Sequence, residues 1–167
     1  MQHETSSTDA PSVKGHATNN EHYRHLGIMT ALSFIAMYFL MYAMVNALDN
    51  VYMNFNQLYM AGLMAAPMVL IELAVMRGMY KDKRLNTLFA GAAVVALVVF
   101  FLFVRRQTAI GDRQFLRSMI PHHAGAILMC NEASIGGADI KRLCQNILSS
   151  QQAEIDQMKA MLGENRD

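Results

Sequence analysis

Three long runs of apolar residues dominate the pattern along the chain, at residues 26–45, 58–76 and 85–104. The first and third runs contain no charged residue, and the second contains only Glu72. A helix needs about 20 apolar residues to cross the hydrocarbon core of a bilayer, whereas a helix of this length in a soluble protein shows a polar face. The pattern therefore predicts an all-α integral membrane protein with three transmembrane helices.

Charged residues in the loops predict how these helices cross the membrane. The first loop, residues 46–57, has no Lys or Arg, whereas the second, residues 77–85, has four. Because basic loops stay in the cytoplasm, we expect the second loop and the N-terminus inside and everything after residue 104 outside. In the bacterial inner (cell) membrane, the C-terminal domain would then be periplasmic or extracellular. The arginines that follow the third run oppose this orientation: Arg105, Arg106, Arg113 and Arg117.

Residues 1–25 precede the first apolar run and have no apolar periodicity. They are rich in Ser, Thr, Asn and His, a composition typical of disorder, so we predict a disordered tail that contains histidines. A free amino terminus with His3 can chelate Cu(II), but a solvated tail is the simpler interpretation and the one we favour.

The segment after the third run predicts a linker followed by a helical hairpin. Residues 105–111 form the linker, and residues 112–163 have a helical periodicity that Gly136 and Gly137 interrupt. Two helices joined by so short a turn pack antiparallel, and Gly163 is a typical C-terminal stop. Because a hairpin of this size buries little surface by itself, we expect it to complete a four-helix bundle in a homo-oligomer.

Sulfur and imidazole side chains share one face of the first hairpin helix. Met119, His122 and His123 follow the i, i+3, i+4 spacing, and antiparallel counting places Cys130 opposite Cys144. Thioethers and thiolates favour Cu(I), and imidazole binds several transition metals. Methionines at helical spacing also fill ordinary cores. The residues alone therefore leave a metal site and a packed core as equal alternatives.

Signatures of common enzymes do not occur in the sequence. The chain has no Glu-x-x-His pair of the kind that di-iron bundles use, no His-Glu-x-x-His motif and no Gly-rich phosphate loop. A net charge of +1 gives no field that would attract nucleic acid. We therefore expect a protein that binds a ligand in or at a lipid bilayer, and not an enzyme.

The first hairpin helix carries a motif that resembles the signature of the domain-of-unknown-function 305 family: Asp112-x-x-Phe115-x-x-x-Met119-Ile120-Pro121-His122-His123-x-x-Ala126. The second hairpin helix is similar to the second motif of that family, with Ile147-x-x-x-Gln151-x-x-Glu154-Ile155-x-x-Met158. The resemblance covers about the last third of the chain. The family is described as ferritin-like helical bundles, and some members are periplasmic copper-binding proteins of the CopM type.

This resemblance implies copper, as Cu(I), held by Met and His outside the cytoplasm. The ligand positions that it carries over are Met119, His122, His123 and Met158, with Met129 and Met161 as further candidates. Cys130 and Cys144 are not part of the family pattern, so they are either thiolate ligands or a disulfide. Their expected opposition outside the cytoplasm favours the disulfide.

Methionines also recur within the apolar runs of the chain, which has 15 Met in all. In the second run, Met60, Met64 and Met68 lie within one helical face, and Glu72 follows. Such a face would suit a transporter that passes Cu(I) across the membrane, although Met is also an ordinary apolar residue in a span. An acid within a span is a functional candidate, but Glu72 lies near the cytoplasmic end and can pair with Arg77.

The sequence therefore predicts a membrane-anchored Cu(I)-binding protein that serves copper tolerance or delivery. Two alternatives remain open at this point. One is a copper transporter or channel lined by methionines, and the other is a membrane scaffold or interaction protein that binds no metal.

Overall fold

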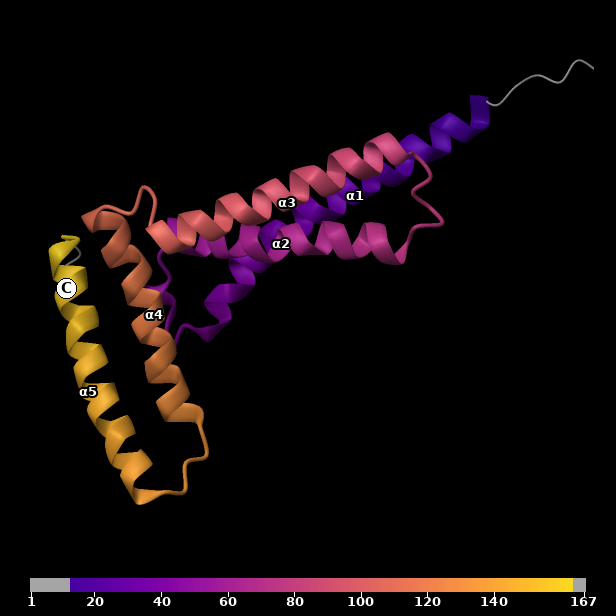
Figure 1. Cartoon of the computed structure of the whole chain (residues 1–167). Coiled ribbons are helices and arrows are strands. Elements are labelled where there is room, and N and C mark those ends of the chain that lie inside the picture. Colours follow the sequence, from indigo (N-terminus) through magenta and orange to yellow (C-terminus); the bar gives the residue numbers. More distant parts are fainter. Residues whose placement is uncertain (1–12, 164–167) are drawn as a thin grey trace, which may run out of the picture.

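The computed structural model describes residues 13–163, and their side chains from residue 21 onward. Over this range the chain is all-helical, as the sequence predicts, with five α-helices (Figure 1). Two short 3-10 turns, η1 and η2, join the first two helices. The elements in chain order are α1 (Val13–Leu40), η1 (Met41–Met44), η2 (Leu48–Asn50), α2 (Phe55–Val75), α3 (Lys83–Arg106), α4 (Asp112–Glu132) and α5 (Ala138–Met161).

The helices form two parts that meet at one end of the longer part (Figure 1). Helices α1, α2 and α3 pack into an elongated three-helix unit, and α4 and α5 form an antiparallel hairpin. Helix α4 contacts η1, η2 and α2, and α5 packs on α4. The hairpin therefore lies at the end of the three-helix unit where α1 ends and α2 begins.

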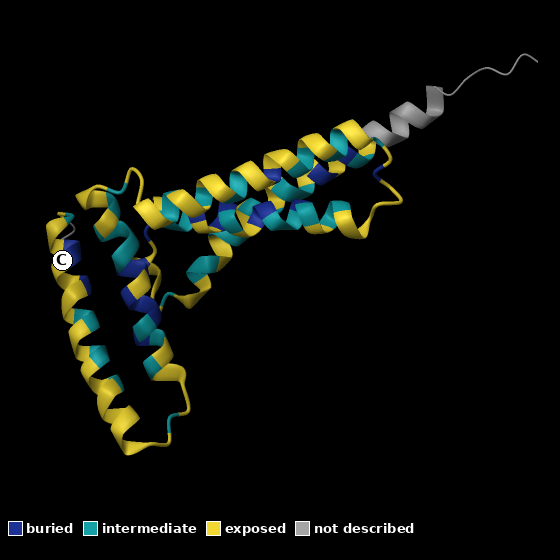
Figure 2. Ribbon diagram, viewed as in Figure 1, coloured by how far each residue is buried: buried dark blue, intermediate teal, exposed yellow. Residues whose placement is uncertain are grey.

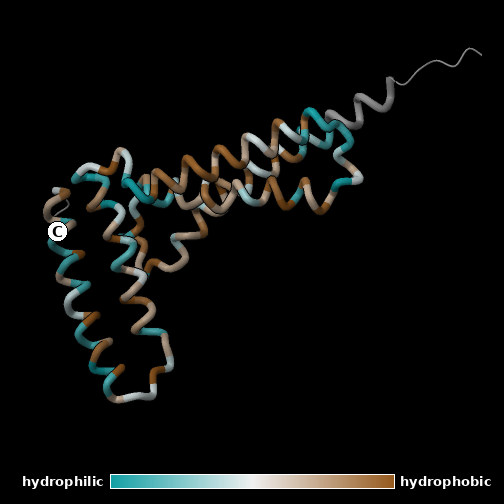
Figure 3. Tube along the Cα trace, viewed as in Figure 1, coloured by the Kyte–Doolittle hydropathy of each residue, from teal (hydrophilic) through white to brown (hydrophobic). Residues whose placement is uncertain are grey.

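The three-helix unit carries most of the apolar residues of the chain (Figure 3). Residues 21–44 and helices α2 and α3 are each long and apolar enough to cross a membrane, judged by length and composition. Large apolar side chains on these helices also face outward, among them Leu32, Ile71 and Val95, which are each about 61–62% exposed (Figure 2). An apolar exterior on long helices is compatible with a lipid surrounding.

Helix α1 begins at Val13, so it includes residues 13–25, which the sequence assigns to the N-terminal tail. Tyr23 and Leu26 are buried in a cluster with residues of α2 and α3. The Tyr23 hydroxyl is 2.6 Å from Oδ1 of Asn86 and donates to it. Tyr23 and Leu26 are three residues apart, so they extend the apolar face of α1 toward the N-terminus by one turn. His3 lies outside the described residues.

The hairpin has a core of its own between α4 and α5. Ile120 and Ile155 are fully buried, and Ala124, Ile127 and Met158 pack with them. Tyr52, from the segment that follows η2, closes this core on the side of the three-helix unit. Figure 2 shows the result, in which α4 is buried along much of its length while α5 is mostly exposed.

A disulfide between Cys130 and Cys144 joins the two hairpin helices near their turn. The Cα atoms of the two residues are 5.4 Å apart, a separation typical of disulfides. This confirms the opposition predicted by antiparallel counting. The hairpin ends at Gly163, whose φ of +79° suits a glycine after a helix C-terminus.

Candidate metal site

A pocket of about 550 Å³ lies between α4 and the adjoining ends of α1 and α2. Six potential soft-metal ligands line it. We call this site the methionine pocket and define it by Met41, Met44, Met60, Met119, Met129 and His122. The neutral polar side chains in its wall include those of Asn54, Gln57 and Ser118.

Local structure explains how three separate segments supply these side chains. Helix α1 ends at Leu40, and the chain tightens into η1, which carries Met41 and Met44. The side chain of Asn54 caps α2 by accepting a hydrogen bond of 2.9 Å from the backbone N–H of Gln57. This cap fixes the first turns of α2 and thereby the position of Met60.

The third segment is α4, which turns one face toward the pocket. Met119, His122 and Met129 lie on this face at positions i, i+3 and i+10. Gly125, in the same wall, is buried and lies against η1: a Cβ atom there would be 3.5 Å from the Met44 carbonyl oxygen, an ordinary van der Waals contact. Helix α4 and η1 therefore pack directly on each other, and their methionines line the same pocket.

The chemistry of the pocket is that of soft, neutral donors. Five thioethers and one imidazole line it, and no Asp, Glu or Cys is among its lining residues. Among the side chains that the structure describes, from residue 21 to residue 163, no group of three or more His, Cys, Asp or Glu could hold a metal ion. A hard cation such as Mg²⁺ or Ca²⁺ prefers oxygen ligands, whereas thioethers select Cu(I). The donor set of the methionine pocket therefore fits Cu(I).

His122 and His123 lie in different environments although they are adjacent. Successive residues on an α-helix point about 100° apart. As a result His122 is exposed and lines the methionine pocket, whereas His123 is buried and faces α5. Their ring centroids are 6.1 Å apart. Only His122 of the two therefore reaches the candidate site.

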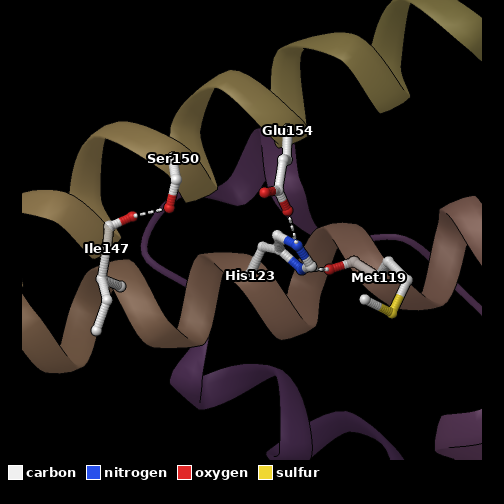
Figure 4. Close-up of polar contacts among 5 residues, drawn as sticks. All are labelled: Met119, His123, Ile147, Ser150 and Glu154. Atoms are coloured by element: carbon white, nitrogen blue, oxygen red, sulfur yellow. Dashed lines mark hydrogen bonds and ion pairs between the residues drawn. The ribbon is translucent and has the colours of Figure 1, made fainter.

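Both ring nitrogens of His123 have protein partners (Figure 4). Nδ1 is 2.9 Å from the Met119 carbonyl oxygen, and Nε2 is 2.6 Å from Oε2 of Glu154 on α5. The Met119 carbonyl oxygen can only accept, so Nδ1–H donates to it, and Nε2 is paired with the Glu154 carboxyl group. A metal ligand needs a free nitrogen lone pair, and both nitrogens of His123 are engaged in this fold. Its role as a ligand stays a prediction, and in this structure the residue joins α4 to α5.

The remaining ligand candidates of the hairpin lie away from the pocket. Met158 is 8% exposed and belongs to the hairpin core. Met161 is 63% exposed, in the last turn of α5. Cys130 and Cys144 are paired in the disulfide, so neither offers a thiolate. Each of these residues fits a structural or surface role in this fold.

The proposed membrane path through α2 is only partly connected to the pocket. Met60 lines the pocket, but Met64 and Met68, one and two turns further along α2, do not. Glu72 lies near the far end of α2, where its Oε1 accepts a hydrogen bond of 3.2 Å from the Tyr80 hydroxyl. Burial raises the pKa of Tyr80, and the nearby Glu72 carboxylate raises it further. The tyrosine, not Arg77, is the partner of Glu72 in the described residues.

The sequence prediction missed Met41 and Met44 as candidate ligands. Both lie at the end of the first apolar run, where methionine is an ordinary apolar residue. The 3-10 turn η1 removes them from the regular helix and directs them toward α4. Only the Met-x-x-Met spacing at the end of a span could have indicated them.

Comparisons with known proteins place this fold in a family. The family model described as Domain of unknown function (DUF305) matches residues 46–162, which extends well beyond the last third of the chain and includes α2 and α3. An uncharacterized protein of Acanthamoeba polyphaga mimivirus is 31% identical over 145 residues, which cover 83% of this chain and 91% of that protein. No solved structure matches the chain. The chain therefore belongs to the DUF305 family.

Proposed function

We propose that this protein is a membrane-anchored copper-binding protein that holds Cu(I) in the methionine pocket, for copper tolerance or delivery. The observation that carries the proposal is the composition of the pocket, which is lined by thioethers from η1, α2 and α4 and by one imidazole, with no carboxylate among its lining residues. Thioethers are weak ligands for hard cations and good ligands for Cu(I). Bound copper would be carried as cargo, and no step of catalysis is assigned to it.

The three-helix unit supplies the membrane anchor in this proposal. Its outward-facing apolar side chains suit lipid, and the methionine pocket lies at the end that carries η1 and η2. The loop at that end, residues 46–57, has no Lys or Arg, so the positive-inside rule places it outside the cytoplasm. The protein would therefore meet copper on the periplasmic or extracellular side, with its N-terminus in the cytoplasm.

The exposure of His122 suits a site that both takes up and releases an ion. His122 lies at the solvent-accessible side of α4, while Met41 and Met119 are half-buried. A thioether carries no proton to displace, so His122 is the one donor of the pocket that must be neutral to bind.

Anchoring fits the arrangement of the methionines better than transport. A transporter needs donors that continue from the pocket through the three-helix unit, but Met64 and Met68 of α2 do not line the pocket. We also propose a homo-oligomer, because α5 leaves Ile140 and Leu143 more than half exposed on the hairpin. A second hairpin would cover these side chains and complete a four-helix bundle.

Competition with a coloured Cu(I) chelator tests the proposed site. The purified chain in detergent, under a reductant that maintains Cu(I), should remove copper from the chelator. Met119→Leu combined with His122→Ala should weaken binding at least about tenfold, the scale on which even outer-shell partners matter at metal sites. Met158→Leu combined with Met161→Leu is the matched control, because it also removes thioethers from the hairpin, but from outside the pocket.

Each outcome of this titration has a defined meaning. Loss of binding in the pocket variant alone supports the proposal. Equal binding in all three proteins would mean that the copper ion binds elsewhere in the chain. Absence of binding in the wild type would favour the alternative of a membrane scaffold that binds no copper.

A further inference from the structure

The arginines that oppose the predicted orientation gather at one place in the fold. Arg105 and Arg106 form the last turn of α3, and Arg113 and Arg117 lie on successive turns at the start of α4. Asp112 is the only acidic residue between positions 105 and 131. A concentration of positive charge therefore lies where the three-helix unit meets the hairpin, and the copper proposal does not use it.

Arg117 differs from the other three arginines because it is half-buried and lines a second pocket. This pocket has a volume of about 250 Å³ and is separate from the methionine pocket, although Asn54 borders both. Its walls come from α1 through Tyr38, from the start of α2 through Leu58, and from α4 through Gln114 and Arg117. No acidic side chain is among its lining residues.

The other polar side chains of this pocket are already engaged, whereas Arg117 is not. Asn54 accepts from the Gln57 backbone N–H and donates to the Tyr52 carbonyl oxygen. Oε1 of Gln114 accepts from the backbone N–H of Phe55 at 3.2 Å. By contrast, Nε of Arg117 is buried and has no hydrogen-bond partner among the described residues. A buried N–H without an acceptor is costly, so this donor of the half-buried guanidinium leaves a hydrogen-bond position open to a ligand in the pocket.

The guanidinium group and the position of the pocket together define the chemistry of that ligand. Guanidinium presents a planar fork of donors that matches the oxygens of phosphate. Tyr38 lies near the end of α1, and Leu58 lies in the first turn of α2, so the pocket is at the boundary between the apolar helices and the polar hairpin. In a bilayer this boundary is the level of the lipid headgroups, where tyrosine and arginine are common.

We propose that the pocket at Arg117 binds a phosphate group, with the guanidinium of Arg117 as its anchor and the exposed Arg113, one turn earlier, adding positive potential. The headgroup of an anionic phospholipid and free inorganic phosphate share this chemistry. Because the apolar walls of Tyr38 and Leu58 suit the glycerol and upper acyl chain of a lipid, the headgroup is the source that we expect.

Calorimetric titration of the full chain in a neutral detergent tests this proposal. Short-chain phosphatidylglycerol is one ligand, and inorganic phosphate is the other. Arg117→Gln should weaken phosphatidylglycerol binding about tenfold, because it removes a charge-assisted hydrogen bond. Arg105→Gln is the matched control, since it removes the same charge at the same end of the three-helix unit but outside the pocket, and it should change binding less than about twofold.

The outcomes separate the two sources and also the two proposals. If phosphatidylglycerol binds and its binding depends on Arg117, the ligand of the pocket is the lipid headgroup. If inorganic phosphate binds equally well, the ligand is the free ion. Unchanged affinity in Arg117→Gln, or an equal loss in Arg105→Gln, overturns the site. If Arg117→Gln does not fold, Leu58→Phe is the second test, because this variant narrows the pocket and retains Arg117. Unchanged phosphatidylglycerol binding in Leu58→Phe would then overturn the proposal. Copper affinity should be the same in all of these variants.

Discussion

His122 and His123 provide a sharp test of the structure because adjacent residues of the same type are assigned opposite roles. We predict that His123→Ala destabilises the hairpin, whereas His122→Ala leaves its stability unchanged. The reason is the environment of each ring. His123 is 6% exposed and bonded to both α4 and α5, while His122 is exposed at the edge of the methionine pocket.

The size of the effect follows from the contacts that are lost. The bond from His123 to the Glu154 carboxylate is a hydrogen bond to a charged group, a kind that contributes about 1.5–3 kcal/mol. However, the Glu154 side chain is 52% exposed, so solvent screening reduces this contribution to about 1 kcal/mol. Loss of the bond to the Met119 carbonyl and of the buried ring surface adds about 1–2 kcal/mol. We therefore expect His123→Ala to lower the free energy of hairpin opening by about 2–3 kcal/mol, against less than about 0.5 kcal/mol for His122→Ala.

Hydrogen exchange measured by mass spectrometry follows this local opening directly. A loss of about 2 kcal/mol corresponds to exchange about 30-fold faster in the most protected amides of α4 and α5. The amides of α2 and α3 serve as an internal control in the same protein. Unchanged protection in His123→Ala, or equal loss in His122→Ala, would refute the assignment of the buried ring to a structural role.

Three further predictions concern the packing of the chain. Replacing Cys130 and Cys144 by Ser removes a cross-link between residues 14 positions apart, which should lower the stability of the hairpin by about 3 kcal/mol. Thermal unfolding followed by circular dichroism would measure this loss, and an unchanged unfolding midpoint would contradict the prediction. Gly62→Ala should lower the free energy of unfolding by about 1–3 kcal/mol, because the added Cβ would collide with the Phe100 ring between α2 and α3. A thermal stability of this variant equal to that of the wild type would contradict this packing. Leu143→Arg should convert the proposed homo-oligomer into a monomer in detergent, as measured by light scattering; an unchanged mass would exclude α5 as the interface.

Long, strongly periodic segments of the chain could be predicted well from the sequence. The three apolar runs correspond to α1, α2 and α3, since a helix of about 20 apolar residues has few alternatives. The hairpin followed from the Gly136–Gly137 turn, and counting back from that turn paired Cys130 with Cys144. In each case the determining interaction is local, or one short turn connects the partners.

Features that depend on contacts between distant segments could not be predicted. The sequence predicts both His122 and His123 as ligands of the same metal site, because sequence spacing does not show that α5 covers only one side of α4. Met41 and Met44 were missed because the sequence pattern does not show that η1, after α1, packs against α4. The apolar period of α1 begins earlier than expected, since Tyr23 is buried only by its contacts with α2 and α3.

If the three-helix unit and the hairpin together form the proposed copper site, removing thioethers from the three-helix unit alone must weaken copper binding. Met44→Leu combined with Met60→Leu removes two thioethers from the methionine pocket without changing α4. Met37→Leu combined with Met64→Leu is the matched control, because these residues lie in the same two apolar runs but outside the pocket. We predict that the dissociation constant for Cu(I) rises at least about tenfold in the first variant and stays at the wild-type value in the second. Equal affinity in both variants would contradict a site shared between the two parts of the molecule.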